Sequence, residues 1–147
     1  MKHYKLRVAR TFVLVLGLLS NSSWADVRSV FVQSTLDYNA ILITEVDVVF
    51  VYSDEVLAQI PETKAAWYGN KRQLMESSGE SIEVVNLFIP QGFDSSMLSL
   101  PERRGEAVKV FVFGQHDVSS RPPIDISEME NVLVQINQFG IAVSSRD

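Results

Sequence analysis

The chain has 147 residues, enough for one ordinary domain, and its 18 acidic side chains outnumber 13 basic ones. This balance disfavours nucleic acid and anionic lipid as partners, because both bind through clustered Lys and Arg. The sequence has no cysteine, so we expect neither a disulfide framework nor a lipid attached to a cysteine.

The first 25 residues have the pattern of a secretory signal. A basic head comes first, formed by Lys2, Lys5, Arg7 and Arg10. The apolar run 12–19 follows, and it is shorter than the ~20 residues that a membrane-spanning helix needs. Small residues at Ser23 and Ala25 fit the two positions that a signal peptidase reads. A buried N-terminal helix is the alternative, but it would leave four like charges in need of partners.

We therefore predict cleavage between Ala25 and Asp26. The expected products are a signal peptide, residues 1–25, and a single mature domain, residues 26–147. All four basic residues of the head leave with the signal, so the mature chain would carry 9 basic and 18 acidic side chains. In a bacterium, this domain would be periplasmic.

Strands are predicted where β-branched and apolar residues alternate or run together. The segments are 27–32, 40–44, 46–52, 82–89, 108–113, 124–126, 132–136 and 141–143. Segment 82–89 is apolar on both faces, which favours a central strand. Residues 137–140 are typical of a hairpin turn between the last two strands.

A helical insertion is predicted at about residues 54–77. Asp54 and Glu55 suit the start of a short helix, and Pro61 would interrupt it and begin the next one. Gly79 is expected to end the second helix. Strands joined by turns, with one helical interruption, predict a mainly β fold, an antiparallel two-sheet β-sandwich.

Few residues suggest chemistry. His116 is the one histidine of the mature domain, and with Asp117 it resembles a catalytic dyad, but no serine lies in a nucleophile-elbow motif. Nucleotide-binding glycine motifs are absent, and one histidine with carboxylates is an uncommon zinc set. We expect no metal, no cofactor and no enzymatic activity.

The candidate partner surface combines aromatic, apolar and basic residues. Trp67 and Tyr68 are adjacent, so on a helix they point about 100° apart, and one can pack on the sheet while the other stays partly exposed. Core packing is the more common role for such residues, and an exposed aromatic is a natural contact anchor. The predicted loop 94–106 and the turn before it supply the other candidates: Phe93, Met97, Leu98, Arg103 and Arg104.

The order of these elements resembles the small outer-membrane lipoprotein family of type VI secretion, TssJ type. The similar features are a Val-rich strand ending in Val51 and Tyr52, the helical insertion, and the strand that runs into Pro90 and Gly92. Further features are a Leu100-Pro101 stretch, the strand 107–113 and the closing segment 137–143. The resemblance covers roughly residues 45 to 143 and implies a transthyretin-like sandwich. The family carries an acylated cysteine directly after its signal, whereas this chain has Asp26 there.

The resemblance implies a structural role, docking onto protein subunits of an envelope-spanning secretion complex, without a lipid anchor. Two alternatives remain open. One is a pilotin-like or chaperone-like helper of another secretion or pilus system, which differs in its partner. The other is a small periplasmic enzyme or ligand-binding protein that uses His116, Asp117 and Asp125.

Overall fold

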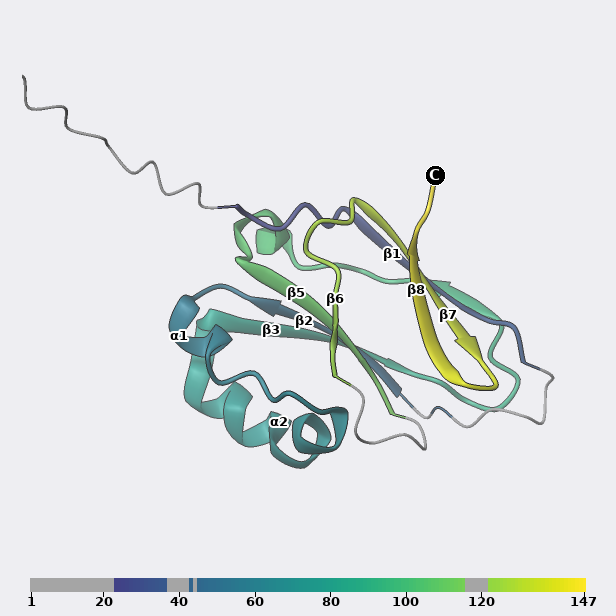
Figure 1. Ribbon diagram of the computed structural model, residues 1–147, viewed down its shortest axis with the longest axis horizontal. Coiled ribbons are helices and arrows are strands. Elements are labelled where there is room, and N and C mark those ends of the chain that lie inside the picture. Colours follow the sequence, from purple (N-terminus) through teal and green to yellow (C-terminus); the bar gives the residue numbers. More distant parts are fainter. Residues whose placement is uncertain (1–22, 37–42, 44, 116–121) are drawn as a thin grey trace, which may run out of the picture.

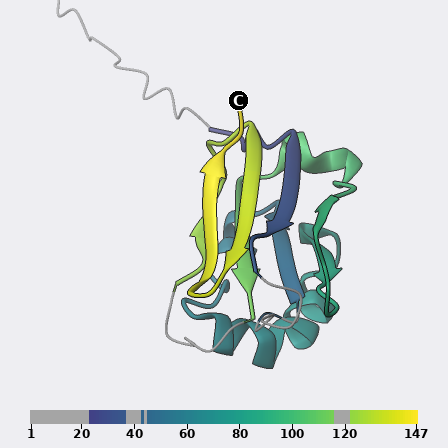
Figure 2. The same cartoon turned by 90° about the vertical axis from the view of Figure 1, so that its right-hand side faces the viewer.

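A computed structural model describes residues 23–36, 43, 45–115 and 122–147. Within these residues, eight strands form two four-stranded sheets that face each other (Figures 1 and 2). The first sheet has the order β4-β1-β7-β8, and the second has the order β3-β2-β5-β6. The predicted two-sheet β-sandwich with a helical insertion is confirmed.

The strands of the first sheet are β1 (Ser29–Ser34), β4 (Ser95–Met97), β7 (Asn131–Asn137) and β8 (Gly140–Ser145). The strands of the second sheet are β2 (Glu45–Val51), β3 (Ile82–Phe88), β5 (Lys109–Gly114) and β6 (Ile124–Asp125). Most of the predicted strands lie within a few residues of these bounds. The predicted strand 40–44 falls, apart from Ile43, outside the described residues.

The interior between the two sheets is filled by alternating aliphatic side chains. Val46, Val48 and Phe50 of β2 face Val132, Val134 and Ile136 of β7 across this core, and all six are fully buried. Alternation in each strand sends every second side chain to the same face.

Helices α1 (Asp54–Leu57) and α2 (Lys64–Ser78) interrupt the chain between β2 and β3, as predicted. The helix start differs from the prediction: α2 begins after Thr63, whose side chain caps the backbone N–H of Ala66, and Pro61 lies in the connection. Gly79 ends the helix with a positive φ of 54°. Short 3-10 turns follow at η1 (Gly79–Ser81) and later at η2 (Glu102–Glu106).

The prediction that segment 82–89 is a central strand is wrong. Among the strands that the structure describes, β3 lies at the edge of its sheet and pairs with β2 alone. Its two apolar faces have another cause, because α2 covers the outer face of this sheet (Figure 1). Ile82 and Val84 belong to the cluster beneath α2, whereas Val85 and Leu87 pack toward the core between the sheets.

The prediction expected antiparallel strands throughout, but one strand pair is parallel. β1 and β7 run parallel, with Val30 beside Val132 and Val32 beside Val134. The other strand pairs are antiparallel, and β7 and β8 form the predicted hairpin. Within the described residues, no helix is long and apolar enough to cross a membrane.

Candidate docking surface

Trp67 lies in the core and not on a surface. Its side chain is fully buried, its ring stacks on Phe113 with centroids 4.7 Å apart, and its indole N–H donates to Asp47 at 2.9 Å. The prediction that Trp67 belongs to a partner surface is therefore wrong. Trp67 attaches α2 to the outer face of the second sheet.

Tyr68, the next residue on the helix, is half-buried. Its hydroxyl donates to the carbonyl oxygen of Phe113 at 3.2 Å, and the Lys71 ammonium lies 5.1 Å from its ring centre. Burial, together with the negative charges of Asp47 and Glu45, raises the pKa of Tyr68 above its usual value. The phenol is neutral at physiological pH and anchors the helix to the end of β5.

A polar network beside these aromatics was missed in the sequence. The carboxylate of Asp47 is fully buried and accepts hydrogen bonds from Trp67, from Lys71 at 3.0 Å and from Asn86 at 2.6 Å. Glu45 lies two residues earlier on the same face of β2 and accepts a hydrogen bond from Asn86 at 2.9 Å. The sequence did contain a signal for this network. Asp47 lies on the same strand face as Val49 and Val51, and a carboxylate buried among apolar residues requires hydrogen-bond partners.

The loop candidates have mixed exposure. Met97 is 53% exposed at the edge strand β4, whereas Phe93 and Leu98 pack against the core between the sheets. Phe93 and Leu98 pack against one hydrophobic cluster and Trp67 belongs to another, so the structure does not bring all the candidates into one patch.

The two arginines after Pro101 are held by contacts within the chain. The Arg103 guanidinium stacks 4.4 Å from the Tyr52 ring centre and donates to Glu106 and to the carbonyl of Glu80. The hydrogen bond and negative charge of Glu106 raise the pKa of Arg103. Arg104 donates to the carbonyl of Pro101 at 3.2 Å. Both side chains keep partly exposed faces.

Two phenylalanines are more exposed than any predicted aromatic candidate. Phe88, the last residue of β3, is 67% exposed, and Phe139, in the turn between β7 and β8, is 69% exposed. Phe139 stands between Gln138 and Gly140, and the centre of a two-residue turn faces solvent, so the sequence contained a signal for it.

The alternative catalytic cluster cannot be placed, because His116 and Asp117 lie outside the described residues. Asp125 is described, and its carboxylate accepts from Lys109 at 2.8 Å and from Ser127. Burial opposes ionisation, but the bonds from Lys109 and Ser127 outweigh it and hold the pKa of Asp125 below its usual value. Among the described residues, no three His, Asp or Glu side chains are placed to hold a metal ion.

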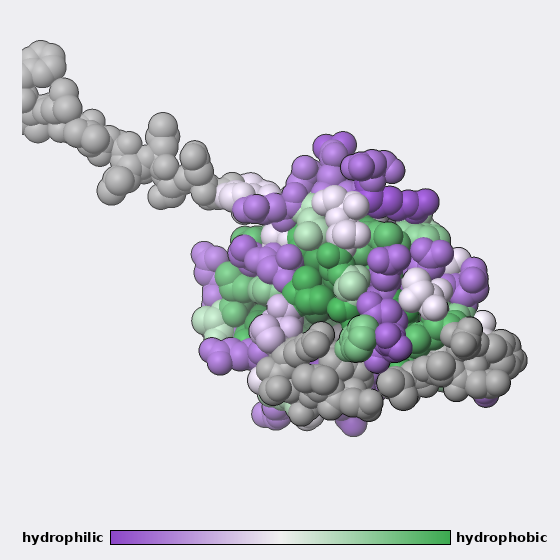
Figure 3. Space-filling view, turned by 45° about the vertical axis from the view of Figure 1, so that its right-hand side comes forward, coloured by the Kyte–Doolittle hydropathy of each residue, from purple (hydrophilic) through white to green (hydrophobic). Residues whose placement is uncertain are grey.

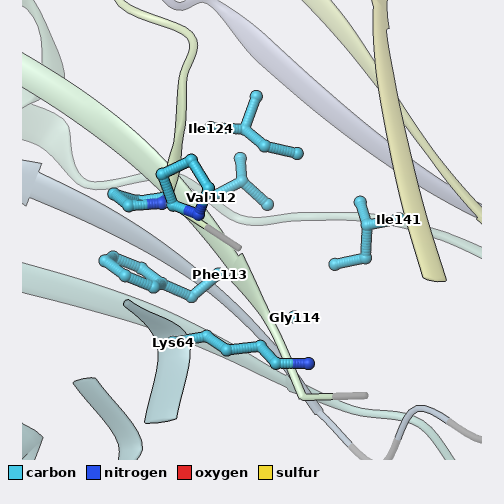
Figure 4. A pocket seen from close by; sticks show the side chains of 8 residues that line it. Lys64, Val112, Phe113, Gly114, Ile124 and Ile141 are labelled. Atoms are coloured by element: carbon cyan, nitrogen blue, oxygen red, sulfur yellow. The ribbon is translucent and has the colours of Figure 1, made fainter. Parts of the chain in front are cut away.

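A cavity of about 370 Å³ opens between the two sheets on the side where β6 and β8 form their edges. Figure 4 shows Ile141 of β8 across the cavity from Ile124 of β6, with the buried Lys64 of α2 at a third side. A side chain at position 114 would collide with Ile141, so at Gly114 the cavity is lined by backbone atoms. The lining is otherwise apolar and includes Val112, Phe113, Pro122 and Pro123.

Comparison with known proteins adds a likeness of fold. No family model and no curated protein matches the chain. Among solved structures, it is similar to Serratia marcescens Lip, described as a membrane bound component of the type VI secretion system. The TM-score is 0.50 at 10% identity, over 81% of this chain and 96% of that one.

The chain is likewise similar to the type VI secretion lipoprotein TssJ1 from Pseudomonas aeruginosa. The TM-score is 0.51 at 7% identity, over 81% of this chain and 95% of that one. These similarities show that the fold resembles the TssJ type, as the order of the predicted elements implied.

Proposed function

We propose that the protein is an exported accessory or assembly component of a bacterial envelope secretion complex of the type VI kind, which acts by docking onto other protein subunits. The single observation that supports this most is the shared fold, because the likeness extends over 95% of TssJ1 and 96% of Lip. Fold alone does not determine function, so the proposal needs a direct test.

The proposal places the protein in the periplasm after removal of residues 1–25. Because the chain has no cysteine, it would be held at the envelope by protein contacts and not by an acylated cysteine. Docking needs no cofactor or catalytic group, and the proposal gives none to His116.

The test is affinity capture of the tagged, natively exported protein from gently crosslinked envelopes, followed by identification of the captured proteins. The proposal expects a type VI secretion subunit. Capture of a pilus subunit, or of a subunit of another secretion system, would contradict this proposal and favour the pilotin-like or chaperone-like helper.

The matched control for this capture is the variant His116→Ala. It is expected to capture the same subunit in the same amount. Complete loss of function in a normally folded His116→Ala protein would contradict the non-enzymatic role.

A further inference from the structure

Among the described residues, no strand pairs with the outer edge of β8. Arg146 donates its N–H to the carbonyl of Asn131, and the register pairs Leu133 with Ser144 and Gln135 with Ala142. Hydrogen-bonded pairs alternate in an antiparallel ladder, so the even-numbered residues of β8 bond to β7. The N–H and C=O groups of Ile141, Val143 and Ser145 therefore point away from the sheet.

This edge is also uncharged. Its sequence, Gly140–Ser145, contains no Lys, Arg, Asp, Glu or Pro, the residues that commonly protect an exposed edge strand. The β3 edge differs, since it contains Glu83. Nothing within β8 itself therefore repels an added strand.

Apolar side chains lie next to the edge. Ile141 and Val143 face the core between the sheets and stay partly exposed, as do Ile124 and Met129 from the opposite side. In Figure 3, hydrophobic side chains gather in the middle of the face that includes this side of the sandwich. The cavity of about 370 Å³ lies here too, lined by Ile124 and Ile141.

We propose that β8 is a docking edge for an extended segment of a partner protein, which adds to the first sheet as a fifth strand. Backbone bonds to Ile141, Val143 and Ser145 would hold the segment, and its alternate side chains would enter the cavity between β8 and β6. This inference rests on the proposed docking function and names the surface and the kind of partner.

The charges define the chemistry of that segment. The side chains of the segment that enter the cavity would be uncharged and aliphatic, because the lining is apolar apart from Lys64. The mature chain, with 18 acidic and 9 basic residues, attracts basic residues at the ends of the segment. The same net charge disfavours β8 of a second copy as the occupant, because two such chains repel each other.

The probe is a synthetic peptide of alternating Val and Thr with two Lys at each end. It is added to the ¹⁵N-labelled full mature protein, and hydrogen exchange is followed at each amide. The amides of Ile141, Val143 and Ser145 should exchange ~10-fold more slowly with saturating peptide, whereas those of Ala142 and Ser144 stay unchanged. A peptide with Glu in place of Lys should bind at least ~10-fold more weakly.

Two variants test the edge itself. Ser145→Pro removes an outward N–H at the end of the strand, and Val143→Pro removes one at its centre. Proline is tolerated at an edge where the N–H faces solvent. Each should lose at least ~10-fold in peptide affinity, whereas the matched variants Ser145→Thr and Val143→Thr keep the N–H and should bind normally. Exchange rates in β7 report whether each variant is folded.

The proposal is overturned if the peptide fails to bind, or if it binds without protecting the three outward amides. It is also overturned if both folded proline variants bind like the parent, or if the protein without peptide protects these amides through self-association. Capture from envelopes separates the two proposals. A secretion subunit captured equally by the parent and by Ser145→Pro contradicts the docking edge alone, and no secretion subunit with either contradicts the proposed function.

Discussion

At the scale of single residues, Asp47 shows how this sequence binds its helix to its sheet. A carboxylate in the middle of a Val-rich strand is costly to bury, and here three side-chain donors compensate it: the Trp67 indole, the Lys71 ammonium and the Asn86 amide. Two of these donors come from α2 and one from β3. The network thus fixes the position of the helix as well as satisfying the charge.

Replacing Asp47 by alanine is expected to lower the free energy of unfolding by about 3 kcal/mol, because Trp67 and Lys71 lose their shared acceptor. Urea unfolding followed by tryptophan fluorescence measures it. The control is Glu45→Ala. It removes a 3.5 Å contact to Lys71 and a 2.9 Å hydrogen bond from Asn86, and because Glu45 is partly exposed the loss should be about 1 kcal/mol or less. Equal losses in the two variants would show that the buried network has no special weight.

The sequence predicted the candidate site only in part. The spacing of Trp67 and Tyr68 correctly separated a buried from a half-buried aromatic, because adjacent helix positions diverge in angle. The pattern did not reveal which of the two was buried, since that depends on the position of Asp47 and Phe113 in the sheet. The exposed Phe88 was missed because its strand reads as apolar throughout.

At the scale of elements, most strand locations followed from alternation, but strand order did not. β4 (Ser95–Met97) was missed, because it lies in the predicted loop 94–106. Segment 82–89 was expected in the centre of a sheet because both of its faces are apolar, and α2 accounts for that pattern at an edge. The parallel pairing of β1 with β7 joins residues about 100 positions apart. Local patterns carry no information about such a pairing, whereas the β7–β8 hairpin is local and was predictable.

The short strand β6 is attached to β5 by an ion pair, and its strength should depend on pH. Lys109 bonds to Asp125 at 2.8 Å, and the pKa of Asp125 is lower in the folded protein than its usual value. The resulting stabilisation is present above the unfolded pKa of about 3.9 and is lost as pH falls through the lower folded pKa. Because both side chains are partly exposed, it should amount to about 1 kcal/mol or less.

Asp125→Asn is therefore expected to be less stable than the parent at neutral pH, and equally stable at a pH below the lowered folded pKa of Asp125, where the parent carboxyl is protonated as well. Urea unfolding midpoints at the two pH values measure the difference. The variant Glu76→Gln, in an exposed pair on α2, serves as the control with a smaller effect. A difference between parent and Asp125→Asn that stays constant with pH would contradict this account.

At the scale of the whole molecule, the predicted cleavage site packs against the folded domain just before β1. The N–H of Ala25 donates to the carbonyl of Ala107, and its methyl group is buried, while the N–H of Asp26 donates to Ser127. A peptidase needs an extended, accessible chain at these residues, so we expect cleavage before the domain folds.

We predict that the exported protein begins at Asp26, as measured by its intact mass. Ala25→Lys should block processing, because a small residue is required directly before the cut. Trp24→Leu changes the position between the two small residues and should be processed normally. A mature mass that begins at another residue would show that the cleavage site is wrong.

The most direct test of the docking function uses purified components. The mature protein is titrated calorimetrically with the periplasmic part of the type VI secretion subunit identified by capture. We predict saturable one-to-one binding that weakens as salt is added, because residues 26–147 carry 18 acidic and 9 basic side chains. No binding at concentrations up to ~100 µM, where even weak specific complexes form, would contradict the central claim.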